Sequence, residues 1–165
     1  MIIPPIRPIP LPLPIITHLP PLAIQAVFFI ALLVLASAID IRKRIIPNTI
    51  CAAIALTGLI SFSPVNLFGI LTALPLLIAA VCKQDSIGGG DVKLAGAAGF
   101  VLGFGGGIAG LIVGLAAMLL YHAGKSVVRR LRRDKDRKEN ERASLPMAPF
   151  LSIGFTAAYI LTFAL

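Results

Sequence analysis

Two aspartates stand out among the few ionisable side chains that lie beside long apolar blocks. The chain has seven acidic residues, and four of them fall in a strongly basic stretch where we expect them to be solvated. Asp40 follows the first apolar block. Asp91 follows three glycines and precedes a later apolar block. Both are therefore expected at the edge of a membrane helix. Two carboxylates at close range cannot both ionise cheaply, so one keeps a proton and acts as an acid while the other activates a water. Such a pair predicts hydrolysis without a metal or a covalent intermediate.

Each aspartate also has a simpler interpretation. Asp40 is compatible with an interfacial charge paired to Arg42 or Arg44, and Asp91 with a cap for a helix that begins near Val92. The two aspartates are 51 positions apart, so only the fold can bring them together. The residues alone leave both interpretations open.

The elements that would position this pair are apolar blocks of membrane-spanning length. The 165 residues are 58% hydrophobic and 13% charged, with a mean hydropathy of +0.96, which excludes an ordinary soluble domain. Gly103 and the glycines after it break one long block into two helices. The blocks predict an all-α polytopic membrane protein with about six transmembrane helices and both ends outside; they span residues 22–39, 47–62, 65–82, 94–122 (in two parts) and 145–165.

The basic residues predict the orientation of these helices. Nine of the 15 Lys and Arg residues fall in a predicted cytoplasmic loop, residues 125–142, and five more flank apolar blocks on the same predicted side. This is the pattern of the positive-inside rule, so the charge of +8 does not indicate nucleic-acid binding. The basic loop is interpreted either as a site for anionic lipids or as a solvated connector.

The chain divides into a proline-rich N-terminal lead-in, residues 1–21, and a membrane-embedded domain, residues 22–165. The lead-in holds eight of the 13 prolines and favours an extended polyproline II conformation. The small residues at positions 36–38 resemble a signal-peptidase site, but the basic cluster at 42–44 follows the apolar block instead of preceding it. We therefore expect a retained helix with its N-terminus outside.

Several residues near the aspartates are further candidates. Gly88 and Gly90 leave space for an extended substrate backbone beside Asp91, although a plain flexible turn would have the same sequence. Lys93 is interpreted either as electrostatic support for the pair or as an interfacial lysine whose charged end reaches water. The two cysteines, at 51 and 82, have no CxxC spacing, so no metal and no cofactor are expected.

Three segments resemble the type IV prepilin peptidases, a family of GxGD aspartic peptidases. Asp40 stands seven residues before the Pro of Ile-Pro47-Asn48, as in the family's first motif. The run from Gly88 through Asp91 to Lys-Leu94 is similar to the family's Gly-x-Gly-Asp-x-Lys-Leu motif. The segment from Pro146 to Gly154 resembles its final-helix Pro-Phe and Gly pattern. Together these segments cover most of the chain beyond the lead-in.

The resemblance implies a membrane aspartic endopeptidase with Asp40 and Asp91 as its catalytic pair. Its expected substrates are prepilin or pseudopilin precursors, whose basic leader is removed at the cytoplasmic face of a bacterial or archaeal cytoplasmic membrane. Larger family members carry an N-terminal region with CxxC pairs that is linked to methylation. With 21 residues before the first block and no such pairs, we expect a peptidase-only form like those of Flp or tight-adherence pilus systems.

Two other classes of function are weighed against this one. A presenilin or signal-peptide-peptidase type protease shares GxGD, but it pairs this motif with Tyr-Asp and Pro-Ala-Leu, whereas Ile39 precedes Asp40 and no Pro-Ala-Leu occurs here. A non-enzymatic membrane scaffold or transporter would use glycine-rich helices for packing and the acids for protons or ions. Release of a product from a pilin precursor separates these classes.

Overall fold

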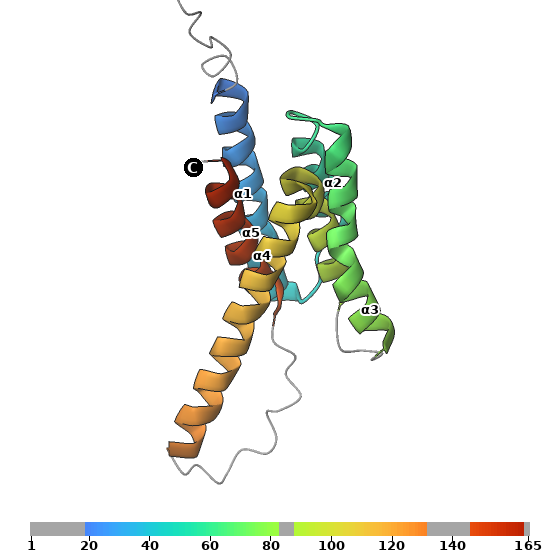
Figure 1. Ribbon diagram of the computed structural model, residues 1–165. Coiled ribbons are helices and arrows are strands. Elements are labelled where there is room, and N and C mark those ends of the chain that lie inside the picture. The colour runs from blue at the N-terminus through green and yellow to red at the C-terminus, as the bar shows by residue number, and fades with distance from the viewer. Residues whose placement is uncertain (1–18, 83–87, 132–145, 164–165) are drawn as a thin grey trace, which may run out of the picture.

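The protein is mostly helical, with short links, in the part of the chain that the computed structural model describes, residues 19–82, 88–131 and 146–163 (Figure 1). Three of its helical segments are long and apolar enough to cross a membrane, and two shorter helices are also apolar. The predicted all-α membrane fold is therefore confirmed, while the number of crossings stays a prediction. The elements are α1 (Leu19–Lys43), α2 (Asn48–Thr57), the 3₁₀ helix η1 (Pro64–Ala73), α3 (Leu74–Cys82), α4 (Gly89–Leu131) and α5 (Ala148–Phe163).

Helix α1 is longer at both ends than its apolar block predicts. It begins at Leu19, so Pro20 and Pro21 occupy the first turn, where a missing backbone donor costs little. It ends at Lys43, which places Asp40 inside its last turn and not at its end. The rest of the proline-rich lead-in, residues 1–18, lies outside the described residues.

Gly103 divides α4 into two helices that fold back on each other. Its backbone has φ 74° and ψ 172°, a conformation that residues with a side chain rarely adopt. A Cβ atom built on Gly107 would lie 3.0 Å from the Cα of Gly99, although eight residues of straight helix would span about 12 Å. The predicted break at Gly103 is confirmed.

Close glycine contacts hold the neighbouring helices against both halves of α4. Gly99 in the first half meets the backbone of Gly69 in η1, and Gly110 and Gly114 in the second half meet Gly154 of α5. A side chain at Gly69, Gly99 or Gly154 would collide with the backbone of the neighbouring helix, so these positions require glycine. These glycines therefore lie at helix–helix interfaces. Around them lies an apolar core that includes Phe29, Leu33, Ile54, Leu94, Leu111 and Phe155.

The far end of α4 differs from the predicted basic loop. The helix continues to Leu131 and extends beyond the other helices, so the first seven residues of the 125–142 segment are helical (Figure 1). The remaining basic residues, from 132 onward, lie outside the described residues.

Glycine packing can be tested with a matched pair of substitutions in α4. Gly99→Ala places a methyl group against the backbone of Gly69, and overpacking of this kind costs about 1–3 kcal/mol. Gly105→Ala meets no atom within 4 Å and should be neutral or slightly stabilising. Thermal unfolding of the detergent-solubilised variants measures the difference. Equal melting temperatures for the two variants would contradict the packing role of Gly99.

The positive-inside pattern predicts which end of the bundle faces the cytoplasm. The C-terminus of α1 and the N-termini of α2, α4 and α5 should be cytoplasmic, because the basic clusters flank them. Alkaline phosphatase, which is active only outside, should be active when fused after Val65 and inactive when fused after Lys135. An active enzyme fused after Lys135 would overturn this topology.

Candidate active site

Asp40 is buried in the last turn of α1 and is held by the first turn of α5. Its side chain is 7% exposed, and its Oδ2 accepts a hydrogen bond of 3.1 Å from the backbone N–H of Ala148. Ala148 is the first residue of α5 and is fully buried. The carboxylate thus faces a helix N-terminus, and among the described residues this contact replaces the ion pair with Arg42 or Arg44 that the sequence left open.

A left-handed residue ends α1 beside this carboxylate. Arg44 has φ 54°, and its N–H donates to the backbone carbonyl of Asp40 at 2.8 Å. This conformation is uncommon for a residue with a side chain, and it reverses the chain so that Ile46 and Pro47 lead directly into α2. Asp40 is therefore fixed through both its backbone and its side chain.

Asp91 is buried at the start of α4 and lies close to Asp40. It is the third residue of the helix, its side chain is 7% exposed, and its N–H donates to the Gly88 carbonyl at 3.0 Å. Its Oδ1 is buried without a hydrogen-bond partner among the described residues. The Asp40 carboxyl is near enough to act on Asp91 electrostatically. The structure thus brings together two carboxyl groups that are 51 positions apart.

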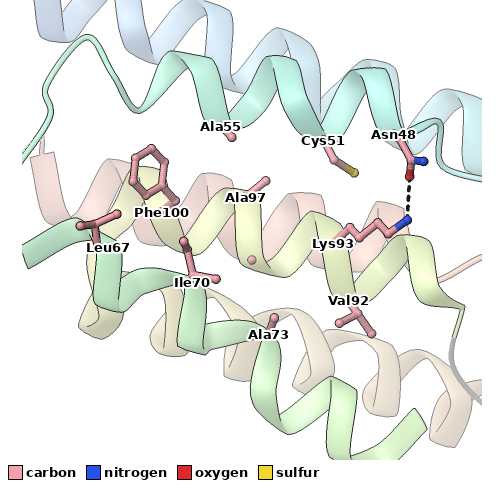
Figure 2. Close-up of a pocket in the computed structure, with 11 residues that line it drawn as sticks. Asn48, Cys51, Ala55, Leu67, Ile70, Ala73, Val92, Lys93, Ala97 and Phe100 are labelled. Atoms are coloured by element: carbon pink, nitrogen blue, oxygen red, sulfur yellow. Dashed lines mark hydrogen bonds between the residues drawn. The ribbon is translucent and has the colours of Figure 1, made fainter. Parts of the chain in front are cut away.

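Two further contacts join the segments that carry the aspartates. A Cβ atom on Gly90 would lie 3.0 Å from the Cβ of the buried Ile46, so glycine at this position lets α4 approach the link between α1 and α2. The Nζ of Lys93 donates to Asn48 Oδ1 at 2.9 Å (Figure 2). Gly90 therefore has a packing function, and substrate contacts of Gly90 and of the exposed Gly88 stay predictions.

Lys93 does not pair directly with either carboxylate in the described part of the chain. Its side chain is exposed and points to Asn48 at the N-terminus of α2 (Figure 2). The predicted electrostatic support for the aspartates would therefore have to act over a longer distance. The observed hydrogen bond instead connects the two motifs that resemble the family.

An apolar groove of about 660 Å³ lies between α2, η1 and α4, with Lys93 and Asn48 at one end (Figure 2). Val92, Gly96 and Phe100 contribute to its α4 side. At about 100° per residue, Asp91 points away from this side of the helix. The groove and Asp91 therefore lie on different sides of α4.

Comparison with known proteins identifies the family. Residues 27–123 match the type IV leader peptidase family. This chain belongs to that family. It is 33% identical over 143 residues to the prepilin leader peptidase/N-methyltransferase of Bacillus subtilis (strain 168). The matched region covers 82% of this chain and 54% of the relative. The chain thus spans about half the length of the curated relative it matches. No solved structure matches the chain.

In this family member, the sequence did not reveal the group that contacts Asp40. The donor is the backbone N–H of Ala148, and every residue except proline carries such a donor. The motif from Pro146 to Gly154 was the available signal, but it indicated a helix and not a role. The partnership of Asn48 with Lys93 was also not predicted, because their 45 positions of separation are closed only by the fold.

No group of three or more metal-binding side chains occurs among the described residues of this protein. Cys51 is buried and Cys82 is exposed, and neither forms a disulfide there. Within the described part of the chain, the acidic groups at the site are the two aspartates. The absence of a cofactor stays a prediction.

The hydrogen bond between Asn48 and Lys93 predicts energetic coupling between α2 and α4. In a double-mutant cycle of Asn48→Ala and Lys93→Met, the two residues should couple by about 0.5 kcal/mol, as expected for an exposed hydrogen bond to a charged group. Thermal unfolding of the four proteins in detergent measures this coupling. The same cycle with Lys125→Met in place of Lys93→Met is the control and should be additive. Full additivity for Asn48 and Lys93 would contradict the contact.

Proposed function

We propose that this protein is an aspartic endopeptidase that removes the basic leader from type IV prepilin or pseudopilin-like precursors. The cleavage takes place at the cytoplasmic face of a bacterial or archaeal cytoplasmic membrane, in which the protein is embedded as a multi-pass enzyme. Asp40 and Asp91 are the catalytic pair. Membership in the type IV leader peptidase family and the name of the Bacillus subtilis relative support this substrate class.

The observation that carries the proposal is the meeting of two buried carboxyl groups at one end of the helix bundle. Each side chain is 7% exposed, and the two interact electrostatically. In such surroundings a single negative charge shared by the pair is the stable arrangement. One carboxylate can then take a proton from water as it attacks the peptide carbonyl, while the protonated partner donates to the carbonyl oxygen.

The charge pattern supports a cytoplasmic site. Arg42, Lys43 and Arg44 directly follow Asp40, and basic residues flanking membrane helices remain on the cytoplasmic side. A precursor with a basic leader before an apolar helix obeys the same rule. Its leader and the two aspartates would therefore occupy the same side of the membrane, without movement of the leader across the bilayer.

The catalytic pair is tested by substituting each aspartate. Asp40→Asn and Asp91→Asn keep size and polarity but cannot exchange a proton in the same way, so each should lower the cleavage rate by about 10²–10⁴-fold. The double variant should be hardly slower than either single variant, because residues that act as one unit are not additive. Co-expression with a prepilin precursor, followed by a blot for the shortened product, measures cleavage.

Asp85→Asn is the control for loss of an acidic charge, since it lies near Asp91 in sequence but outside the motifs, and it should retain most activity. Membrane fractionation and thermal unfolding confirm that the inactive variants are inserted and folded. Near wild-type cleavage by either Asp40→Asn or Asp91→Asn would refute the pair. If the wild-type protein released no product from any prepilin, a scaffold or transporter function would be favoured instead.

A further inference from the structure

The two aspartates have unequal surroundings. Asp40 Oδ2 accepts the N–H of Ala148 at 3.1 Å, in a buried position at the first residue of α5. Asp91 Oδ1 is equally buried but has no hydrogen-bond partner among the described residues. When two neighbouring carboxyl groups share one proton, the group with the better hydrogen-bond donor carries the negative charge.

The helix dipoles do not reverse this difference. Asp91 lies in the first turn of α4, where the helix dipole favours an anion. Asp40 lies in the last turn of α1, where the dipole of that helix disfavours an anion. Asp40 also faces the N-terminus of α5, which offsets the unfavourable end of α1. A direct hydrogen bond to a charged group stabilises an anion more than a dipole alone does. The balance therefore favours an anion at Asp40.

We propose that the N-terminus of α5, through the Ala148 N–H, holds Asp40 ionised and leaves the shared proton on Asp91. Asp40 is then the general base and Asp91 the general acid of the peptidase. Ala148 is a positioning residue that acts through Asp40. This assignment rests on the proposed function for its chemical roles, but the location of the proton is a property of the free enzyme.

The resulting reaction balances for protons and bonds. Asp40 removes a proton from water as the water oxygen bonds to the peptide carbon, and Asp91 gives its proton to the carbonyl oxygen. The resulting gem-diol breaks its C–N bond when Asp40 returns its proton to the leaving nitrogen and a gem-diol hydroxyl returns one to Asp91. The products are a carboxylic acid and an amine, and the enzyme regains an ionised Asp40 and a protonated Asp91.

Chemical labelling of the full-length protein in detergent locates the proton. A small aryl-oxy epoxide alkylates an ionised carboxylate, whereas a diazoacetyl ester reacts with a protonated carboxyl. Peptide mass spectrometry at neutral pH should find the epoxide adduct on Asp40 in roughly tenfold or greater excess over Asp91, the ratio that a hydrogen bond to a charged group provides. The diazo adduct should show the opposite preference.

Substitution of Ala148 tests whether its N–H causes this preference. Ala148→Pro removes the donor at the first position of a helix, where proline is tolerated, and should abolish the epoxide preference for Asp40. Ala148→Gly retains the donor and should preserve the preference. Thermal unfolding shows whether both variants are folded. If Ala148→Pro is not folded, the wild-type and Ala148→Gly labelling patterns still decide where the proton lies.

The outcomes separate this inference from the proposed function. Epoxide labelling that prefers Asp91, or that does not distinguish the two residues, would overturn the assignment even if the protein cleaves prepilin. Preservation of the Asp40 preference in a folded Ala148→Pro variant would overturn the role of α5. If the protein does not cleave prepilin but shows the expected labelling pattern, the peptidase function is refuted. The assignment of the proton to Asp91 then still holds.

Discussion

Two carboxyl groups lie in a nearly closed site at the end of a membrane helix bundle. The free-energy cost of this placement governs the arrangement around them. Asp40 and Asp91 are each almost fully buried, and their mutual repulsion adds to the loss of hydration. Among the residues that the structure describes, a buried backbone donor from Ala148 offsets part of this cost. Because that donor belongs to the first turn of α5, the last helix must dock before the site is complete.

Glycine contacts make this docking close enough to reach the carboxylate. Gly154 of α5 lies against the backbone of Gly110 and Gly114, where any side chain would collide. In a bilayer, lipid competes equally for apolar surfaces, so close backbone packing replaces much of the hydrophobic driving force between helices. The glycines of α4 thus do more than relax the chain, since they set the distance between the helices that carry the site.

A second set of contacts aligns the cytoplasmic ends of α1, α2 and α4. The left-handed turn at Arg44 directs the chain into α2, Gly90 packs against Ile46, and Lys93 binds Asn48. The contacts of Gly90 and Lys93 join the segment that follows Asp40 to the segment around Asp91. These motif residues therefore hold the two segments together, and the apolar groove beyond Lys93 lies on a different side of α4 from Asp91.

The sequence by itself determined the membrane class, the all-helical fold, the break at Gly103 and the choice of Asp40 and Asp91 as candidates. These features depend on local composition, on the length of apolar blocks and on motif spacing, all of which are written along the chain. Helix ends were less predictable, because the extension of α1 past Asp40 and of α4 to Leu131 crosses from apolar into charged residues. Periodicity and hydropathy do not show where a helix ends once it has left the apolar block.

Only the tertiary structure decided which groups the aspartates meet. The donor to Asp40 is a backbone N–H 108 positions away, so no side-chain type could predict this contact. Lys93 was equally compatible with the carboxylates and with water, and the packing of α2 beside α4 gave it Asn48 instead. Side-chain types restrict the chemistry that a chain can perform, but contacts between distant segments decide which atom receives each hydrogen bond, because helix packing alone sets those distances.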